Sequence, residues 1–389
     1  MSLNYGVSRS SPSPPTSARI DLGNLLHNLF RTKQCVAEEC EILAIVKANA
    51  YGHGAVPVTR ALVQAGVRRF GVATLEEGVQ LRDAGISHPI AVLGPIVPSE
   101  IPSLVAHRLI PVIYELSMAR EFAAQVRGAA APYPIHVKID TGMGRLGFEA
   151  DQLPSLFNMA DLDRVLEVDG VMSHLADADS RDPAYTDEQV KRFHVALDKM
   201  AASGRTFPLI HMANSAGIIM HPATHFSMVR PGIMLYGYHT LPHGSPPIDL
   251  RPVLSWRSTI ALIRAIPRGG CVSYNRTFTA QRASRIAILP VGYGDGYSRR
   301  LSNKGSILIR GRRLPVVGRV CMDMTMVDVT DAPDAEPGDE AVLIGRQGSL
   351  AVTASDLAAA LDTIPYEVLC SIGPRVPRLY RDSAAALSQ

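Results

Sequence analysis

The fold is decided by the stretch Ala44-Ile-Val-Lys47-Ala-Asn-Ala-Tyr51-Gly-His53-Gly54. It begins inside an apolar run over residues 41–46, which has the length and composition of a buried strand. A helical pattern follows from 55 to 65, so the glycine-bearing segment between them is expected to join a strand to a helix. In parallel α/β folds, functional groups sit at such loops. Lys47 is then either a lysine that extends its ammonium group into solvent or an amine of lowered pKa that reacts with an aldehyde.

The same pattern of a strand followed by a helix repeats along the first two thirds of the chain. Short apolar runs predict strands at Leu43–Val46, Phe70–Ala73, Ile90–Leu93, Ile110–Ile113, Ile135–Ile139, Val168–Met172, Leu209–Met212 and Met228–Val229. Amphipathic segments predict helices at Thr74–Ala84, Ser99–His107, Leu116–Val126, Ala150–Ala160 and Thr186–Ala202. The last begins with Thr186-Asp-Glu-Gln189, which has the spacing of a capping box. The number of such units is close to eight, which favours a closed (β/α)8 TIM-like barrel over an open sheet.

The pattern changes near the proline-rich segment Leu241-Pro-His-Gly-Ser-Pro-Pro-Ile248, which reads as a linker. Beyond it, strand patterns predominate at Trp256–Ile266, Arg285–Val291, Ile307–Val317, Thr325–Val329 and Glu340–Ile344, with one clear helix at Ala354–Leu361. The predicted organisation has three parts. A disordered Ser/Pro-rich leader over 1–16, without the apolar core of a signal peptide, precedes a barrel over 17–245, which includes a first strand at Ser17–Leu22. A mostly β C-terminal domain covers 246–389.

The composition is that of an ordinary globular protein, with 389 residues, 47% hydrophobic and 19% charged. The formal net charge is +3 and the arginine pairs are scattered, so nucleic-acid binding is not expected. No apolar run reaches the ~18 residues that a membrane helix requires. Five cysteines without a Cys-x-x-Cys motif argue against a disulfide framework and a zinc ribbon. We expect a cytoplasmic protein without a membrane segment.

Two loops have spacings with more than one interpretation. Gly142-Met-Gly144-Arg145-Leu-Gly147 follows a predicted strand and matches the dinucleotide-binding pattern. It lies in mid-chain and no clear carboxylate closes a βαβ unit, so we favour a loop that brings Arg145 to a carboxylate or a phenolate oxygen. His174 is followed by Asp177 and Asp179, but this spacing is awkward for tetrahedral metal ligands, and a histidine inside the barrel is the simpler interpretation. Two later strand ends offer groups suited to a phosphate, namely Ser215, Gly232 and Ile233.

Taken together, these stretches resemble the alanine racemases, fold-type III enzymes that use pyridoxal 5′-phosphate (PLP). The resemblance runs from about Ser17 to Tyr380. It rests on ordered motifs: Val46-Lys47-Ala-Asn-Ala-Tyr51-Gly-His-Gly, Lys138-Ile-Asp-Thr-Gly-Met-Gly-Arg145-Leu-Gly, His174, His211-Met-Ala-Asn-Ser215, Arg230-Pro-Gly232-Ile233-Met-Leu-Tyr-Gly, Ser-Tyr274, Gly-Tyr293, Cys-Met322-Asp323 and Tyr366-Glu-Val. Any single tyrosine among them is more often a core residue, so the ordered set carries the resemblance.

The resemblance implies a role for each of these residues. Lys47 would hold PLP and act as one base, and Tyr274 of a partner subunit would act as the base on the other face. His174 would neighbour that tyrosine, with Arg230 behind it and facing the pyridine nitrogen. The phosphate would be bound by Tyr51, Ser215, Gly232, Ile233 and Tyr366. The substrate carboxylate would be bound by Arg145, which would also contact the PLP phenolic oxygen, and by the backbone of Met322. Supporting residues would be Lys138, which as a carbamate would hold Arg145, together with Asp323 and Tyr293.

The implied activity is the interconversion of L-alanine and D-alanine by two bases in a homodimer, which supplies D-alanine for peptidoglycan. Two departures from the family pattern put side-chain specificity in question: Asn275 stands where glycine is frequent, and Gly294 where alanine is common. The alternatives are a racemase of broader specificity or a related PLP decarboxylase. Arg230 opposes the decarboxylase, whose family places an acid at the pyridine nitrogen. The predicted β domain with Tyr274 opposes a PLP carrier built from a single barrel.

Overall fold

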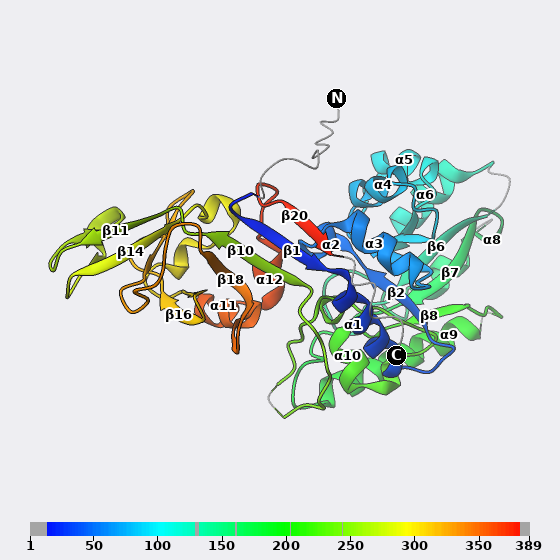
Figure 1. The fold of residues 1–389 in the computed structure, drawn as a ribbon. Helices are drawn as coiled ribbons and strands as arrows, with labels where there is room; N and C mark the ends of the chain where they lie inside the picture. Colours follow the sequence, from blue (N-terminus) through cyan, green and yellow to red (C-terminus); the bar gives the residue numbers. More distant parts are fainter. Residues whose placement is uncertain (1–13, 129–131, 160–161, 203, 243, 382–389) are drawn as a thin grey trace. The chain divides into compact units, whose positions relative to one another are not determined.

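The computed structural model of the chain describes residues 14–128, 132–159, 162–202, 204–242 and 244–381. These residues form two compact units (Figure 1). The barrel unit contains Asp21–Val253, and the β unit contains Leu254–Arg381 with the described residues up to Ile20. Of the predicted leader over 1–16, residues 1–13 lie outside the described residues.

The barrel unit is a closed barrel of eight parallel strands. Its strands are β2 (Glu41–Ile45), β3 (Arg69–Val72), β4 (Ile90–Val92), β5 (Ile110–Ile113), β6 (Tyr133–Lys138), β7 (Leu166–Met172), β8 (Leu209–His211) and β9 (Met228–Val229). The barrel closes where β2 pairs with β9, with Ile42 opposite Val229. These strands correspond to the eight apolar runs, so the predicted fold class is confirmed.

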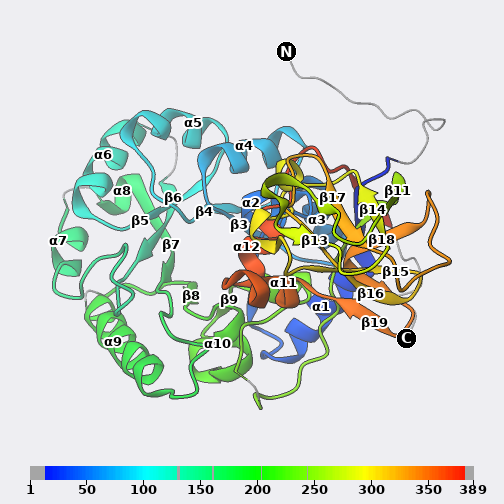
Figure 2. The same cartoon turned by 90° about the vertical axis from the view of Figure 1, so that its left-hand side faces the viewer.

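Helices surround the strands, as Figure 2 shows for α4, α5, α6, α7, α9 and α10. The helices of this unit are α1 (Leu22–Gln34), α2 (Lys47–Tyr51), α3 (Ala55–Gln64), α4 (Leu75–Asp83), α5 (Ile101–Ala106), α6 (Leu116–Val126), α7 (Leu153–Phe157), α8 (Leu162–Val165), α9 (Ala184–Ala201) and α10 (Ser215–Met220). Each longer helix buries one apolar face; α9, for example, buries Phe193, Ala196 and Met200. Within the described ranges, no helix combines the length and apolarity needed to cross a membrane.

The start of α9 differs from its prediction. The helix begins at Ala184 with Pro183 as N-cap, so the capping box expected at Thr186 is wrong. The side chain of Gln189 instead accepts the N–H of Ala176 at 2.9 Å and donates to the carbonyl oxygen of His174 at 3.1 Å. Hydrogen bonds to a neighbouring loop thus replace the local cap, and they fix the loop that carries His174.

The described part of the β unit has three sheets, most of whose strand pairs are antiparallel, and the two α-helices α11 and α12. The largest sheet contains β1 (Ser17–Asp21), β10 (Leu254–Thr259), β15 (Ser306–Ile309), β16 (Arg312–Pro315), β18 (Glu340–Gln347), β19 (Leu350–Val352) and β20 (Arg378–Arg381). The smaller sheets are β11 (Leu262–Ile266) with β14 (Ser284–Leu289) and β17 (Thr325–Asp328), and β12 (Cys271–Val272) with β13 (Phe278–Thr279). The helices are α11 (Ala354–Leu361), as predicted, and α12 (Pro365–Cys370), which the sequence did not indicate.

The strand β1 corrects one predicted boundary. It was assigned to the barrel, but it pairs antiparallel with β10, from Ser17 opposite Arg257 to Ile20 opposite Leu254. Ala18 and Ile20 are fully buried in this position. The alternation of the segment identifies a strand, but its partner lies far along the chain and no local pattern specifies it.

Candidate active site

The segment after β2 forms a left-handed turn that begins at Lys47. Four consecutive non-glycine residues, Ala48 to Tyr51, have φ angles between 51° and 53°. An L-residue in this conformation costs roughly 1–2 kcal/mol, so a run of four stores considerable strain. Such strain persists only where surrounding contacts enforce it, and it is concentrated at functional sites. The sequence predicted a loop here but gave no sign of its handedness.

Glu77, near the start of α4, holds this turn. One of its carboxylate oxygens accepts the N–H of Ala48 at 2.6 Å, and the other accepts the N–H of Ala73 at 2.7 Å. The side chain of Asn49 closes the turn by accepting the N–H of Ala55 at 2.8 Å. A single carboxylate thus ties the loop after β2 to the loop after β3. Glu77 was missed in the sequence because nothing in its local pattern distinguishes it from a surface helix residue.

The turn directs Tyr51 toward the loop after β9. Tyr51 is buried and its ring packs on Tyr236, with 4.8 Å between centroids. A Cβ on Gly232 would lie 2.6 Å from the Tyr51 hydroxyl, so only glycine leaves room for that group. The Ser215 hydroxyl accepts the N–H groups of Gly232 at 3.0 Å and Met234 at 3.3 Å. Three of the predicted phosphate-binding residues therefore meet here, and the fourth, Ile233, follows Gly232 in the chain.

Arg230 lies in the barrel interior and joins two histidines. Its Nη2 group donates to the Ser173 and Met212 carbonyl oxygens at 2.7 and 2.9 Å, and to His174 Nδ1 at 2.9 Å. Its Nη1 group donates to His211 Nδ1 at 3.0 Å. Burial lowers the pKa of Arg230 to about 9, which leaves the guanidinium charged at neutral pH. Burial and the charge of Arg230 together hold the pKa of His174 well below its usual value, so this ring is neutral.

Lys138, at the end of β6, belongs to a group of positive charges. It is only 4% exposed, and burial followed by the charges of Arg145 and Arg230 lowers its pKa to about 8. The charge of Lys47 acts on it in the same direction, and Asp140 opposes them. Four cationic side chains thus gather at the carboxyl ends of the barrel strands. Such a concentration of positive charge attracts an anionic ligand.

The carboxylate of Asp140 organises the glycine-rich loop. It accepts the N–H groups of Gly142, Met143, Gly144 and Arg145 at 2.8, 2.8, 3.2 and 3.1 Å. Burial raises the pKa of Asp140, but these four hydrogen bonds outweigh it and hold the pKa below its usual value. The N–H groups that would cradle a nucleotide phosphate are already bound to this carboxylate. The loop therefore fits the predicted role of presenting Arg145, whose side chain is exposed.

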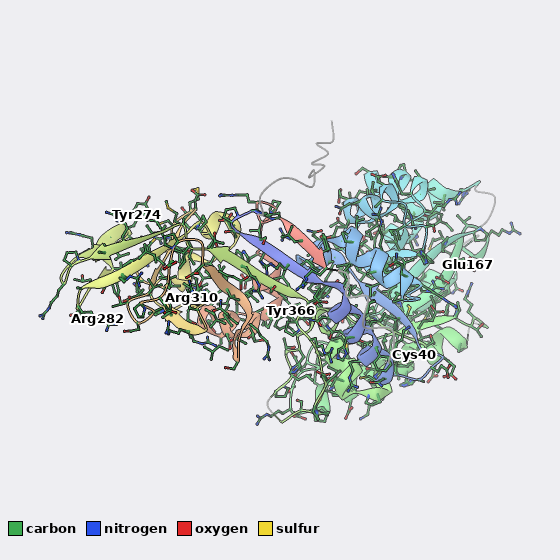
Figure 3. All side chains as sticks on the ribbon, in the orientation of Figure 1. Cys40, Glu167, Tyr274, Arg282, Arg310 and Tyr366 are labelled. Atoms are coloured by element: carbon green, nitrogen blue, oxygen red, sulfur yellow. The ribbon has the colours of Figure 1, made fainter. Side chains whose placement is uncertain are left out.

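The β unit carries the predicted second base. Tyr274, on the short 3-10 helix η4 (Tyr274–Arg276), is 68% exposed and lies at the surface of this unit (Figure 3). The hydroxyl of Ser273 lies 3.5 Å from Cys321 Sγ, which places Tyr274 beside the segment that follows Cys321. Asn275 has a φ of 58°, a left-handed conformation that asparagine tolerates, which accounts for its use where glycine is frequent. Tyr366 is half-buried on α12.

Met322 and Tyr293 lie beside each other in this unit. The N–H of Gly294 donates to the Met322 carbonyl oxygen at 2.8 Å. Asp323 forms an ion pair with Arg375 at 2.7 Å. Met322 and Tyr293 are 52% and 43% exposed, which is unusual for large apolar side chains. A Cβ on Gly294 would lie 2.5 Å from the guanidinium of Arg375, so an alanine at this position would displace that side chain.

The predicted site residues thus fall into two groups. Those brought together at one end of the barrel unit are Lys47, Tyr51, Lys138, Arg145, His174, Ser215, Arg230, Gly232 and Ile233. Those that lie in the β unit are Tyr274, Tyr293, Met322, Asp323 and Tyr366.

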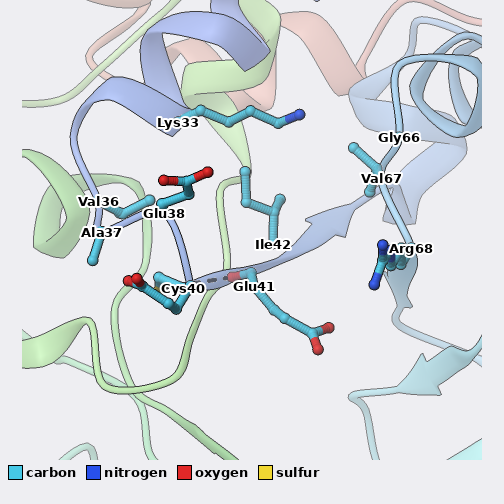
Figure 4. A pocket seen from close by; sticks show the side chains of 11 residues that line it. Lys33, Val36, Ala37, Glu38, Cys40, Glu41, Ile42, Gly66, Val67 and Arg68 are labelled. Atoms are coloured by element: carbon cyan, nitrogen blue, oxygen red, sulfur yellow. Dashed lines mark hydrogen bonds between the residues drawn. The ribbon is translucent and has the colours of Figure 1, made fainter.

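A cavity of about 690 Å³ lies at the amino end of β2 (Figure 4). Its lining includes Lys33, Cys40, Glu41 and Arg68. Glu41 begins β2 and Lys47 follows its end, so the cavity and the lysine are at opposite ends of the strand. Functional sites of parallel barrels form at the carboxyl ends. Burial raises the pKa of Cys40 to about 11, which keeps its thiol protonated and unreactive.

The sequence matches the models of both domains of one known protein family along most of its length. Residues 20–240 match the alanine racemase N-terminal domain, and residues 253–380 match the alanine racemase C-terminal domain. The chain belongs to the alanine racemase family. The resemblance inferred from the motifs is confirmed, and with it the assignment to the enzymes that racemise alanine.

Individual members of the alanine racemase family agree with this result. The alanine racemase of Halothermothrix orenii is 44% identical over 372 residues, which cover 95% of this chain and 97% of that protein. The Bacillus anthracis alanine racemase structure with bound L-Ala-P has a TM-score of 0.90 at 33% identity, and covers 96% of this chain and 97% of that one. The Bartonella henselae alanine racemase structure, with covalently bound pyridoxal phosphate, has a TM-score of 0.85 at 33% identity. The match covers 95% of this chain and 100% of that one.

Replacing Glu77 should loosen the left-handed turn. In Glu77→Gln, one amide oxygen cannot accept both N–H groups, and the amide N–H2 faces the second one. Leaving a partly buried N–H unpaired costs roughly 1–3 kcal/mol, which should appear in the free energy of unfolding measured with urea. Glu76→Gln, an exposed neighbour in the same helical turn, is the matched control. Equal unfolding free energies for the two variants would contradict the role of Glu77.

Proposed function

We propose that this chain interconverts L-alanine and D-alanine with PLP, and that its product D-alanine is used for peptidoglycan. The observation that carries the proposal is the arrangement around the left-handed turn. Lys47 begins this turn, and at its end the Tyr51 hydroxyl lies against Gly232, whose N–H donates to the Ser215 hydroxyl. Membership of the alanine racemase family supports the same reaction. The alternatives are a broader amino-acid racemase and a fold-type III decarboxylase.

The residues present fit PLP. The absence of a Cβ at Gly232 lets the Tyr51 hydroxyl approach that backbone, and the hydroxyls of Tyr51 and Ser215 would bind the cofactor phosphate, with Ile233 and Tyr366 completing its binding. The group of cations suits an anionic ligand, and Lys47 would bind the aldehyde carbon covalently. When bound, the cofactor withdraws electrons from the Cα of an attached amino acid, which makes the Cα proton removable.

Arg230 favours racemisation over competing reactions. In the proposed arrangement its guanidinium would donate a hydrogen bond to the pyridine nitrogen, and it does not readily give up a proton. Arg230 would thereby keep the pyridine unprotonated and a weaker electron sink, which would limit decarboxylation and transamination. The charge of Arg230 at neutral pH and its fixed contacts to His174 and His211 support this role.

Two bases on opposite faces of the cofactor move the Cα proton. Lys47 serves one face and Tyr274 of the partner subunit serves the other. A phenol has a reference pKa of about 10, so a hydrogen-bond donor must stabilise its anion for it to act near neutral pH. His174 can supply that donor: its Nδ1 accepts from Arg230, so the neutral ring carries its proton on Nε2.

The substrate carboxylate is bound by the Arg145 side chain and by the backbone N–H of the partner's Met322. Lys138 holds Arg145 in place as a carbamate, which forms when a neutral amine adds carbon dioxide and releases a proton. The pKa of Lys138 of about 8 supports this step, because part of the amine is neutral near pH 7. The resulting negative charge would pair with the neighbouring guanidinium of Arg145. Asp323 and Tyr293 support the segment that presents Met322.

The active enzyme is a homodimer in the cytoplasm. Tyr274, Tyr293 and Met322 expose large apolar surfaces on one unit, a feature typical of interfaces. A second copy of the chain would cover them and receive Tyr274 in its barrel site. Among the described residues the cysteines form no disulfide, which is in keeping with a reducing compartment.

Incubation of the purified protein with PLP and L-alanine in heavy water tests the reaction. The expected product is D-alanine that carries deuterium at Cα, because the returned proton exchanges with solvent on the bases. Chiral chromatography with mass spectrometry measures both quantities, and a panel of other L-amino acids measures specificity. Release of carbon dioxide with an amine product would indicate the decarboxylase instead. Absence of both products would contradict an enzyme of this family.

Mixing two inactive variants tests the shared site. Lys47→Ala and Tyr274→Phe each lack one base, so each homodimer should have little activity. In a mixed dimer, one of the two sites combines an intact Lys47 with an intact Tyr274 from the other chain. Random assortment should therefore restore about a quarter of wild-type activity, and the purified mixed dimer should have about half, as expected for a two-fold dimer. Co-expressed chains with separate affinity tags provide the mixed dimer. Activity no greater than that of the separate variants would contradict the partner contribution.

A further inference from the structure

A continuous line of polar side chains crosses the interior of the barrel unit below the candidate active site. It begins at Arg230 and ends at the amino end of β2. His211 and His136 are fully buried along it, and their rings pack edge to face with centroids 5.0 Å apart. The line runs through Arg230, His211, His136, Asp169, Arg69 and Glu41.

Arg230 fixes the proton on the first histidine. An arginine only donates hydrogen bonds, so His211 Nδ1, 3.0 Å from Nη1 of Arg230, must accept. Burial and the charge of Arg230 hold the pKa of His211 well below its usual value, so its ring is neutral. The single proton of His211 is therefore on Nε2. It donates to Nδ1 of His136 at 3.1 Å.

The second histidine, His136, accepts at Nδ1 and has its proton on Nε2, as His211 does. His136 Nδ1 accepts, and burial lowers the pKa of this ring so that it too is neutral with its proton on Nε2. That atom is fully buried and has no hydrogen-bond partner among the described residues. The Asp169 carboxylate lies 3.6 Å from it, at ion-pair distance. An aspartate therefore faces the N–H at one end of the line, and an arginine occupies the other.

Asp169 is held as an anion by its surroundings. The proximity of His136, and then the charge of Arg69, keep its pKa below the usual value. Arg69 donates to Asp169 at 3.2 Å and to Glu41 at 2.8 Å. Glu41 borders the cavity shown in Figure 4, so the line ends near solvent. The charges of Arg69 and Glu41 fix the orientation of the Asp169 carboxylate.

We propose that Asp169 and His136 are positioning residues for the active site. The inference rests on the proposed function, because its consequence is the orientation of Arg230 toward the cofactor. The negative charge of the Asp169 carboxylate, 3.6 Å from His136 Nε2, favours a proton on that atom, so both histidines keep their protons on Nε2 and Arg230 keeps an acceptor at His211. If the protons were instead on Nδ1 of both histidines, the Nδ1–H of His211 would face an N–H of Arg230 across 3.0 Å. Two donors at that distance repel, which would turn the guanidinium away from His174 and the pyridine nitrogen.

Two variants of Asp169 distinguish this positioning role from a contribution to the stability of the fold. Asp169→Ala removes the acceptor, and should lower kcat for L-alanine by about tenfold or more, as for other groups that orient a catalytic side chain. KM should change little, because no substrate contact is lost. Asp169→Asn keeps an oxygen that can accept from His136, and should retain most of the activity. Glu167→Ala, an exposed acid on the same strand (Figure 3), is the matched control.

The kinetic results can overturn the proposal. If Asp169→Ala behaves like Glu167→Ala in kcat, the positioning role is wrong. If Asp169→Asn loses as much activity as Asp169→Ala, the charge and not the acceptor matters, and the proposal is again wrong.

Neutron diffraction of the deuterated holoenzyme tests the proton arrangement without reference to activity. Deuterium is expected on Nε2 of both His136 and His211, with none on either Nδ1. Deuterium on Nδ1 of either ring would overturn the inference and leave the proposed racemase function standing. Failure of racemisation in heavy water, by contrast, would leave the observed proton arrangement unchanged.

Discussion

The left-handed turn after β2 is the constraint on which the candidate site depends. Lys47 and Tyr51 are four residues apart, and in a right-handed helix they would share a face above α3. The inverted turn instead keeps Lys47 at the strand end and directs Tyr51 toward Gly232. Its strain is held by the Glu77 carboxylate, which bonds to two loops at once. The turn is therefore held rigid by contacts from the neighbouring βα unit.

The second organising feature is an excess of buried positive charge. Lys138 and Arg230 are both 4% exposed, and their charges add to those of Lys47 and Arg145. Desolvation disfavours the charged form of such groups, which explains the lowered pKa values of Lys138 and Arg230. Asp140, whose charge acts on Lys138, is committed to backbone N–H groups. This group of positive charges therefore bears an electrostatic cost that an anionic ligand would relieve.

Some of this arrangement could be predicted from the sequence. The barrel strands are short apolar runs of parallel sheet type, and local composition identified all eight. The partner of β1 could not be identified, because pairing with β10 is a long-range contact. The turn conformation of Ala48 to Tyr51 carried no signal, since alanine rarely adopts it. Glu77, Asp140 and Asp169 were missed because their roles depend on backbone groups or histidines that only the fold brings near. Resemblance to a family predicted residues that face the ligands but not these supports.

Reduction of the holoenzyme with borohydride, followed by peptide mapping, tests the central claim most directly. Lys47 and Lys138 both lie at the same end of the barrel, and burial lowers the pKa of Lys138 to about 8. Chemistry alone would therefore allow either amine to bind the cofactor aldehyde. Because Lys47 begins the turn that brings the Tyr51 hydroxyl to Gly232, the account predicts the reduced cofactor on the peptide that contains Lys47. A cofactor attached to Lys138, or to no lysine of the barrel, would contradict the account.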